Sequence, residues 1–335
     1  MATHKRYIFP VGQGGFSCEK IGDYVVVYDC GSTSSPGVVE ECIDHLSEDI
    51  DHINILFISH FDKDHVNSIR YLLSVIHVRQ AVTTFIPSEL TAVYGVYTNG
   101  AYGVIMSLFD EYNVETQTIG DRENTIRGFN FNAIWEWIAK SMMSSADFTN
   151  VKTYLLGHGF NMNRLEDADY VETEKETIND AFKAVFGRKG PNAKGLIVLS
   201  QPCKNVATQG SEVLRGGRWI PRFLRMVANC QVSSCLYVGD ADLRNVANKN
   251  DVKDFVQRNR SENPLLFMQM PHHGSRYNRG ARFEADFPAN YYIVNDVDTE
   301  RVQKSPALFR SLTSQRKLLV ARDTYYGMVW TVTEI

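Results

Sequence analysis

The sequence lacks three features that would assign it to a common class of protein. No apolar run approaches the roughly 20 residues of a membrane-spanning helix, and the N-terminal stretch MATHKRYIFPVGQGG lacks the apolar core of a signal peptide. The six cysteines include no Cys-x-x-Cys pair, which argues against structural zinc and against a disulfide framework. These absences predict a cytoplasmic protein with buried thiols and no membrane partner.

The chain also has no excess of positive charge. Its 335 residues carry a formal net charge of -4, and the pI is near 6.2. Any contact with nucleic acid would therefore depend on a local basic surface. With 44% hydrophobic residues the chain can bury a sizeable core, and no change in composition divides it. We expect a single domain over residues 1–335.

Strand and helix patterns alternate along most of the chain. Three short strand patterns with glycines at their joints occupy residues 6–31, and a helix pattern begins at Pro36. Further strands are expected at 54–59, 81–88, 195–200, 234–240, 265–271, 290–296, 317–323 and 328–335, and further helices at 65–78, 219–230, 249–259 and 306–314. This order favours an α/β fold with helices packed outside two facing sheets.

Residues 91–191 have a different pattern, which is mainly helical and less regular. Helices are expected there at 101–114, 131–143 and 176–190. We interpret the segment as a helical insertion within the domain.

Three predicted strands end in residue types that bind metals. The segments are LFISHFDKDH, LYVGDAD and MQMPHHGS. Residues at every second position of an extended loop point the same way, so His60, Asp62 and Asp64 can face one pocket, and His65 turns in as a helix begins. Imidazole and carboxylate groups are ligands for zinc, manganese or iron, and a catalytic site keeps one position for water.

The same segments, in this order, resemble the metallo-β-lactamase fold superfamily, whose fold is an αββα sandwich. The closest likeness is to the hydrolase domain of DNA-uptake competence proteins and their stand-alone relatives. It rests on VGQGG at Val11, YDCGS at Tyr28, YVGDAD at Tyr237 and PHHGSR at Pro271. The resemblance implies a metal-dependent hydrolase.

The resemblance also implies roles for individual residues. One metal site would comprise Asp64, His65, Asp240 and His273. His60 and its neighbouring family positions would form the other site. Asp29 would brace the metal loop, and His272 would orient the adjacent ligand or carry a proton.

Two departures from the family pattern bear on the metal. The family's second histidine is Asp62 here, and this carboxylate makes the first site more anionic and better suited to manganese or magnesium than to zinc. No middle histidine is evident, and His158 is the one candidate replacement; His4 is expected in a mobile terminus. We expect one or two divalent ions, zinc or manganese.

The metal loop also offers groups for the chemistry of hydrolysis. A metal-bound water would lose a proton near neutral pH and act as the nucleophile. Asp62 or Asp64 could hold that water as a general base, and Lys63 could meet an anionic substrate.

Arginines suggest what the substrate is. Arg218, directly before the helix expected at 219–230, and Arg222 share one helical face, where they either bind phosphate or form a solvated face. Arg276 and Arg279 follow the His-His-Gly-Ser motif and lie nearer the metal residues in sequence. Together with the resemblance they favour a phosphodiester substrate, in a nucleic acid or a nucleotide.

Two other functions stay open. The chain could be a catalytically inactive protein of this fold that serves as an interaction component of a multi-protein system. It could also hydrolyse a lactone or thioester, which would require an apolar pocket in place of cations at the metal.

Overall fold

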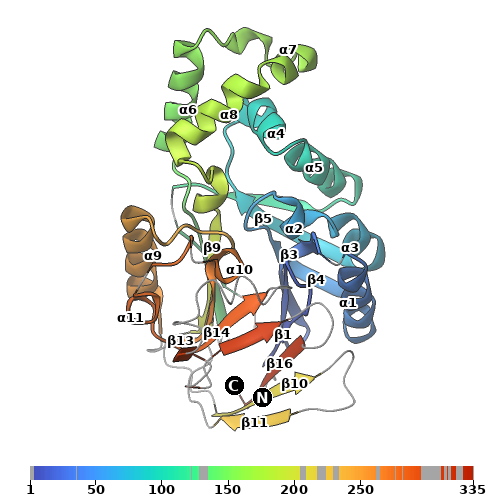
Figure 1. The fold of residues 1–335 in the computed structure, drawn as a ribbon. Coiled ribbons are helices and arrows are strands. Elements are labelled where there is room, and N and C mark those ends of the chain that lie inside the picture. Colours follow the sequence, from blue (N-terminus) through green and yellow to red (C-terminus); the bar gives the residue numbers. More distant parts are fainter. Residues whose placement is uncertain are drawn as a thin grey trace.

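Two β-sheets face each other in the computed structural model of the protein, and helices cover their outer faces (Figure 1). The residues that the structure describes are 4–34, 36–121, 123–127, 135–203, 209–216, 224–228, 234–261, 265–275, 277–280, 282–295, 311–312, 315, 318–321 and 327–334. Of the helices within these ranges, none is long and apolar enough to cross a membrane.

The first sheet joins both ends of the described chain. Its spatial order is β11 (Leu224–Ala228), β10 (Gln209–Gly216), β16 (Gly327–Glu334), β1 (His4–Ile8), β2 (Gly14–Ile21), β3 (Tyr24–Ser32), β4 (His52–Phe57), β5 (His77–Thr84) and β6 (Glu115–Ile119). The pairs from β11 to β3 are antiparallel, and those from β3 to β6 are parallel. The parallel strands bring their carboxyl ends to one edge, where the metal-binding motif follows β4.

The second sheet supplies the other two motifs. Its spatial order is β15 (Leu318–Ala321), β14 (Ala289–Asn295), β13 (Leu265–Gln269), β12 (Cys235–Tyr237), β9 (Leu196–Pro202), β8 (Trp135–Ser141) and β7 (Asn124–Arg127). Strands β12 and β13 pair in parallel, so the Gly-Asp segment after β12 and the His-His segment after β13 leave the sheet at the same edge.

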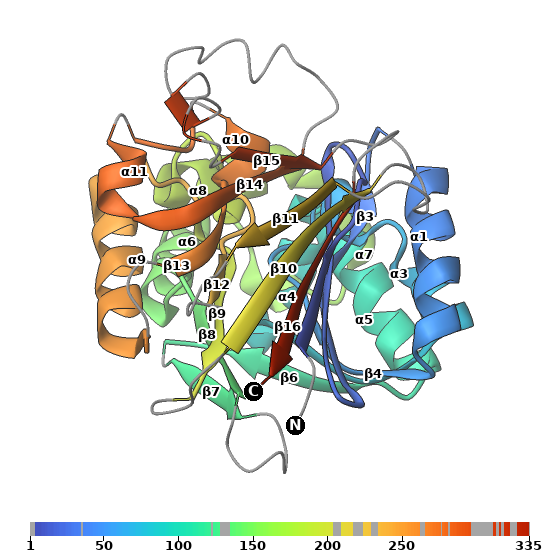
Figure 2. The same cartoon turned by 90° about the horizontal axis from the view of Figure 1, so that it is seen from below.

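Helices pack on the outside of both sheets and at one end of the sandwich. They are α1 (Pro36–Asp49), α2 (Lys63–Val66), α3 (Ile69–Val75), α4 (Thr91–Tyr97), α5 (Ala101–Glu111), α6 (Ser145–Gly157), α7 (Ala168–Thr173), α8 (Lys175–Phe186), α9 (Val246–Asn259), α10 (Pro271–Gly274) and α11 (Phe283–Asp286), with short 3-10 turns η1 (Ser88–Leu90), η2 (Met162–Arg164) and η3 (Pro191–Lys194). Figure 2 shows α1, α3 and α5 on one side of the sandwich and α9 on the other.

Three apolar layers follow from the alternation of side chains along the strands. Val26 lies between the two sheets, whereas its neighbours Val25 and Val27 pack in the outer layer that includes α1. On the second sheet, Tyr237 faces the inner layer and Leu236 faces the layer that includes α9. This arrangement confirms the predicted αββα sandwich.

Two helices predicted from the sequence are wrong. Residues 135–141 form strand β8, with Trp135 and Trp137 packed between the sheets and Ile138 in the outer layer. Residues 224–228 form strand β11, which pairs antiparallel with β10. Aromatic and branched side chains favour strands, and pairing with a neighbouring strand overrides a helical spacing of apolar residues. The helix expected at 306–314 lies outside the described residues except at 311–312.

The segment 91–191 combines helices with strands of the core. Helices α4 to α8 stack at one end of the sandwich, next to the metal-binding edge (Figure 1). Tyr97 of α4 and Phe182 of α8 are in ring contact at 4.4 Å, within an apolar cluster that continues under the first sheet. Strands β6, β7 and β8 belong to the two sheets. The treatment of this segment as one insertion in a single domain stays a prediction.

A buried carboxylate joins the two sheets away from the metal motifs. Glu19 of β2 accepts hydrogen bonds from the side chains of Arg6, Trp137, Ser200 and Tyr237 at 2.6–3.1 Å. Burial alone would raise the pKa of Glu19, but Arg6 and His4 hold the pKa well below its usual value. His4 is fully buried in β1, which corrects its expected place in a mobile terminus.

Candidate metal centre

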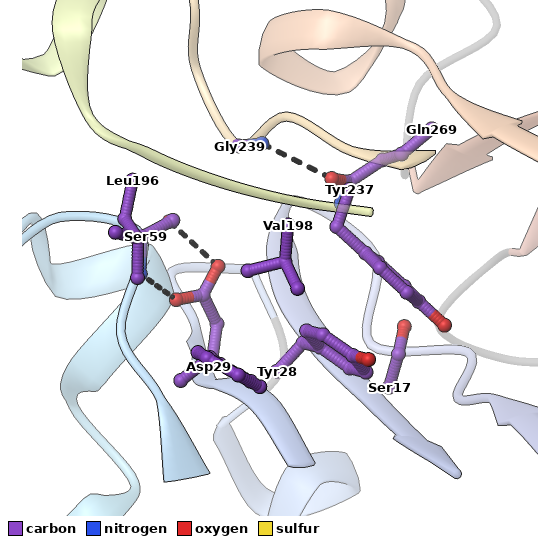
Figure 3. Close-up of a pocket in the computed structure, with 10 residues that line it drawn as sticks. Ser17, Tyr28, Asp29, Ser59, Leu196, Val198, Tyr237, Gly239 and Gln269 are labelled. Carbon is purple, nitrogen blue, oxygen red and sulfur yellow. Dashed lines mark hydrogen bonds between the residues drawn. The ribbon is translucent and has the colours of Figure 1, made fainter. Parts of the chain in front are cut away.

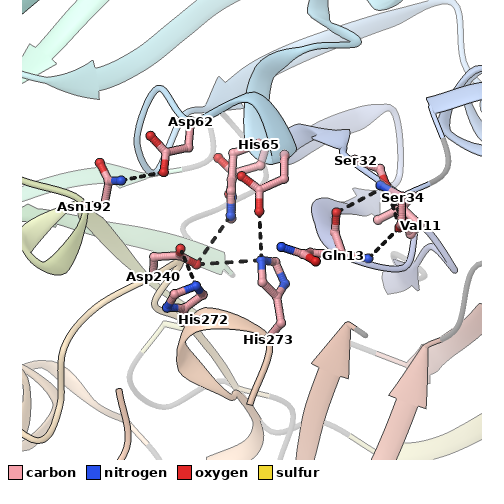
Figure 4. A network of polar contacts seen from close by, with 12 residues as sticks. Val11, Gln13, Ser32, Ser34, Asp62, His65, Asn192, Asp240, His272 and His273 are labelled. Carbon is pink, nitrogen blue, oxygen red and sulfur yellow. Dashed lines mark hydrogen bonds and ion pairs between the residues drawn. The ribbon is translucent and has the colours of Figure 1, made fainter. Parts of the chain in front are cut away.

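The metal loop, defined here as Ser59 to His65, begins after β4 and ends inside α2. It meets Asp240, which follows β12, and His273, which lies in α10 after β13. Figure 4 shows His65, Asp240 and His273 converging from these three elements. The three strand ends therefore meet in space as the sequence motifs predicted.

The first group of potential metal ligands is His60, His65 and Asp240, whose ligand atoms all lie within 4.8 Å of one another. Asp240 Oδ2 is 3.8 Å from His60 Nε2, and Asp240 Oδ1 is 3.4 Å from His65 Nε2. All three side chains are buried. The two carboxylate oxygens of Asp240 thus face different histidines.

The second group is Asp64, His65 and His273, whose ligand atoms also lie within 4.8 Å of one another. His273 Nε2 is 3.2 Å from Asp64 Oδ2 and 3.9 Å from Asp240 Oδ1. His65 is shared with the first group, and Asp240 borders both. Nε2 of His65 can bind only one ion, so a second ion would depend on Asp64 and His273, with Asp240 between the two positions.

Unpaired buried atoms test whether a metal ion fits the first group. His60 Nε2, His65 Nε2 and Asp240 Oδ1 are buried and have no hydrogen-bond partner. Leaving a buried polar atom without a partner costs about 1–3 kcal/mol. A divalent cation would satisfy all three atoms at once, and imidazole with carboxylate is a donor set that zinc and manganese accept. The residues present fit the ion.

Hydrogen bonds behind the group fix which ring nitrogens face it. Ser59 Oγ donates its one proton to the carboxylate of Asp29 at 2.7 Å, and can therefore only accept from His60 Nδ1 at 2.9 Å. His65 Nδ1 donates to Asp29 Oδ2 at 2.8 Å. With the proton on Nδ1, each neutral imidazole directs the lone pair of Nε2 into the group. This is the tautomer that metal ligation requires.

The electrostatic interactions among the protein groups favour anionic carboxylates. Burial alone would raise the pKa of Asp64 and of Asp240, but the neighbouring histidines hold both well below the usual value. Burial, with the charge of His65, lowers the pKa of His60. Burial would lower the pKa of His65 as well, but Asp29 and Asp240 raise it well above the usual value. A bound cation would replace the proton that His65 otherwise carries on Nε2.

Asp29 connects the metal loop to β3. Its φ of 54° places the carboxylate beneath the loop, where Oδ1 accepts from the backbone N–H of Ser59 at 2.7 Å and Oδ2 accepts from the Ser59 hydroxyl (Figure 3). A small cavity of about 10 Å³ lies beside this contact, and Tyr28 and Tyr237 of the two sheets are among its lining residues. These contacts are the ones expected of a residue that braces the metal loop.

Two glycines of the sequence motifs allow their own backbone segments to pack closely against the metal loop. A Cβ atom at Gly15 would lie 2.8 Å from His65 Nδ1, and one at Gly239 would lie 2.8 Å from Ser59 Oγ. Gly239 also has a φ of 48°, a backbone conformation that residues with a side chain rarely adopt. Both motifs need glycine because of this close packing.

The predicted catalytic residues occupy different positions around the groups. Asp62 is in neither group; its Oδ2 accepts a hydrogen bond from Asn192 and lies 3.9 Å from His60 Nε2. Lys63 is exposed at the start of α2. His272 Nε2 lies 3.6 Å from Asp240 Oδ2.

Of the four predicted arginines, Arg279 is the one that lies within the described residues. Arg279 is buried, and its Nε donates to the carbonyl oxygen of Gly274 at 3.2 Å, behind the His-His motif. Arg218, Arg222 and Arg276 lie outside the described residues. The helix expected at 219–230 is wrong at residues 224–228, which form a strand.

His158 also lies away from the site. It caps the C-terminal end of α6, where it is exposed, and its Nδ1 is 2.8 Å from the carbonyl oxygen of Tyr154. It belongs to neither ligand group, so it does not replace the middle histidine of the family pattern.

A pocket of about 290 Å³ opens beside the ligand groups. Asp62, Asp64, Asp240 and His272 line it together with residues that the sequence analysis did not select, namely Gln13, Lys189, Asn192 and Asn278. Ala193 is the one apolar side chain among its lining residues in the described part of the chain. The notable signal missed in the sequence was the segment GRKGPN, where two glycines and a proline interrupt the helix pattern beside a lysine and an asparagine.

Comparisons with known proteins agree with this fold. Residues 19–121, less than a third of the chain, match the model of the metallo-beta-lactamase superfamily. No curated protein matches the sequence.

Similar solved structures have low sequence identity. The metallo-beta-lactamase fold protein YhfI from Bacillus subtilis is 9% identical, with a TM-score of 0.43, and 99% of this chain covers 100% of that one. A diphosphatase from the PhnP family is 9% identical, with a TM-score of 0.42 and 97% coverage of each chain. The peroxy diiron species of the chemotaxis sensor ODP is 16% identical, with a TM-score of 0.27. The alignment covers 41% of this chain and 48% of the sensor, so the chain spans about half the length of that protein.

None of these similarities assigns an activity to the chain. The matched segment contains the metal loop, whereas Asp240 and His273 come from strand ends beyond it. The two facing sheets, the outer helices and the matched segment together show that the chain has the metallo-β-lactamase fold.

Proposed function

We propose that the protein is a divalent-metal-dependent hydrolase that cleaves phosphodiesters. One observation carries the proposal: three buried ligand atoms, His60 Nε2, His65 Nε2 and Asp240 Oδ1, converge without hydrogen-bond partners beside an open polar pocket. Buried atoms of this kind are costly in a purely structural site, and their convergence is expected where a metal ion binds.

The first group would hold one ion through His60, His65 and Asp240, and Asp64 with His273 would hold a second ion on the other side of Asp240. A bound ion would supply an acidified water and positive charge that stabilises the developing oxyanion. The residues around it would place the substrate and move protons.

Asp62 is the candidate general base. Its side chain is 43% exposed on the pocket wall, and Asn192 fixes the carboxylate by donating to Oδ2. The carboxylate can accept a proton from the attacking water as the bond from water oxygen to phosphorus forms.

His272 is the candidate general acid. Asn278 Nδ2 donates to the carbonyl oxygen of Asp240 at 2.8 Å, which leaves Asn278 Oδ1 to accept from His272 Nδ1 at 3.0 Å. The other nitrogen, Nε2, faces the pocket side of Asp240. In the imidazolium form it can donate its proton to the leaving oxygen as the bond from phosphorus to that oxygen breaks.

The pocket chemistry favours a phosphodiester over a lactone. Its walls are polar, and they offer amide groups and the ammonium of Lys189. A lactone or thioester would need an apolar wall for its hydrocarbon part. The surrounding carboxylates repel an anionic substrate, so phosphodiester binding should depend on the bound cation.

The test compares two substrates on manganese-loaded protein. We expect turnover of bis(4-nitrophenyl) phosphate, loss of that turnover with EDTA, and negligible hydrolysis of dihydrocoumarin, a simple lactone. His273→Ala should lower turnover by about 100-fold or more. His158→Ala is the matched control, because that histidine is exposed and outside both groups.

Three results would contradict the proposal. Equal turnover in wild type and His273→Ala would place the chemistry elsewhere. Faster cleavage of the lactone would change the substrate class. Stoichiometric metal without turnover of either substrate would favour the inactive interaction protein.

A further inference from the structure

Lys189 reaches the metal pocket from the helical segment. It follows α8 in a turn bounded by Gly187, with a φ of 78°, and Gly190, with a φ of 64°. A Cβ at Gly190 would collide with the hydroxyl of Tyr97, so this turn packs directly against α4. The geometry of the turn, rather than a helix, delivers the lysine to the pocket wall.

Two contacts hold the ammonium of Lys189 in place. Its Nζ lies 3.0 Å from Asp242 Oδ1 and donates to the backbone carbonyl oxygen of Tyr277. An ammonium has three donors, and these two contacts use two of them. The side chain is 30% exposed, so the third N–H can meet a ligand in the pocket.

Charge around the pocket makes this lysine distinctive. Asp62, Asp64 and Asp240 line the pocket, and Lys189 is the one lysine or arginine among its lining residues in the described part of the chain. A fixed cation opposite a metal centre can bind a second oxygen of a phosphate group.

Tyr277 lies at the other end of the same contact. Its side chain is 52% exposed, and it directly precedes Asn278, which lines the pocket and is buried. The backbone of Tyr277 is held by Lys189 at its carbonyl and by Ser275 Oγ, which accepts from its N–H at 3.3 Å. An exposed aromatic ring on an anchored backbone offers a flat face at low entropic cost.

We propose that Lys189 and Tyr277 form a nucleotide clamp, in which Lys189 binds a phosphate oxygen and the ring of Tyr277 stacks on the base. This inference rests on the proposed function and specifies its substrate class as a nucleoside phosphate or a nucleic acid strand. The direct contact between Lys189 and the Tyr277 backbone places the two residues side by side. Stacking on an aromatic ring tolerates any base, so the clamp predicts weak sequence preference.

The first experiment measures binding and needs no turnover. Calorimetry on manganese-loaded protein compares thymidine 5′-monophosphate with methyl phosphate, which carries the same phosphate and no base. Wild type should bind the nucleotide about tenfold more tightly. Tyr277→Ala should remove this preference, and Tyr277→Phe should keep it because the ring is retained.

The second arm tests the lysine. Lys189→Met should weaken binding of both ligands by about tenfold and leave their ratio unchanged, because both carry the phosphate. Lys253→Met is a matched control: Lys253 pairs with Asp286 at 3.1 Å and is 31% exposed, which resembles Lys189 with Asp242, but it lies on α9. The control should match wild type in both affinities.

Outcomes separate the clamp from the hydrolase. Equal binding of the two ligands by wild type, or binding of neither at millimolar concentration, overturns the clamp, as does a preference that survives Tyr277→Ala. Turnover of bis(4-nitrophenyl) phosphate without a nucleotide preference overturns the clamp alone. A nucleotide preference without turnover of any phosphodiester overturns the proposed function and leaves the clamp as a binding site.

Discussion

The side-chain amide of Asn192 donates a hydrogen bond to Oδ2 of Asp62, across 130 positions of sequence. Asn192 lies in η3, directly after the helical segment, and Asp62 lies in the metal loop where the family pattern has a histidine. The contact gives this carboxylate a partner outside both ligand groups. The proposed role of Asp62 is therefore that of a base beside the metal ligands.

Asp62→Asn should leave the metal content unchanged and lower kcat by about 100-fold, because the amide cannot accept the proton of the attacking water. Asn192→Ala should lower kcat by about tenfold, because the base loses its orientation but keeps its charge. Metal analysis and steady-state kinetics on the same preparations check both effects. Asn163→Ala, on an exposed turn, is the control. Loss of metal from Asp62→Asn would make Asp62 a ligand.

Ser59 should set the affinity for metal through hydrogen bonds alone. Ser59→Ala removes the hydroxyl that accepts from His60 Nδ1 and donates to Asp29, so the imidazole loses its fixed tautomer. We expect metal affinity to fall by about tenfold to 100-fold, measured by competition with a chelating dye. Ser47→Ala removes a hydroxyl that bonds only within α1 and should not change affinity. An unchanged affinity for Ser59→Ala would contradict the tautomer assignment.

Acid should destabilise the protein through His4. Burial lowers the pKa of His4 from 6.5 to about 4, so the unfolded chain binds this proton more readily. The stability contribution is complete above about pH 6.5 and is lost as the pH falls toward 4. Between pH 7 and 4.5, wild type should lose about 2 kcal/mol more than His4→Leu in urea unfolding of the metal-free protein. Parallel pH profiles for the two proteins would show that His4 does not titrate in this way.

The motifs at the strand ends could be predicted from sequence because each combines a local rule with a recognisable spacing. His60, Asp64 and His65 follow an apolar run of strand length, which places these polar ligands at a sheet edge. The Gly-Asp and His-His motifs also follow apolar runs, so the same prediction applies to them. The alternation of sheets and helices predicted the sandwich for the same reason.

The errors lie where tertiary packing overrides local pattern. Trp135 and Trp137 fit a helical spacing but are packed between two sheets as part of β8. His4 looked like a terminal residue but is buried beside Glu19, because the first strand pairs on both sides.

The glycines and proline of GRKGPN mark a turn that contains Lys189 and Asn192, but the sequence does not show that this turn lines the pocket. Their place at the pocket depends on how the turn after α8 packs against α4 and the metal loop, which no local spacing records.

Metal content tests the central claim most directly. Wild type purified without chelator and then supplied with manganese or zinc should hold one or two equivalents, and Asp240→Ala should lose them, because Asp240 faces histidines of both groups. Asp251→Ala, on the outer helix α9, should retain the wild-type content. Wild-type protein that takes up no stoichiometric metal, or Asp240→Ala protein that keeps it, would contradict the account.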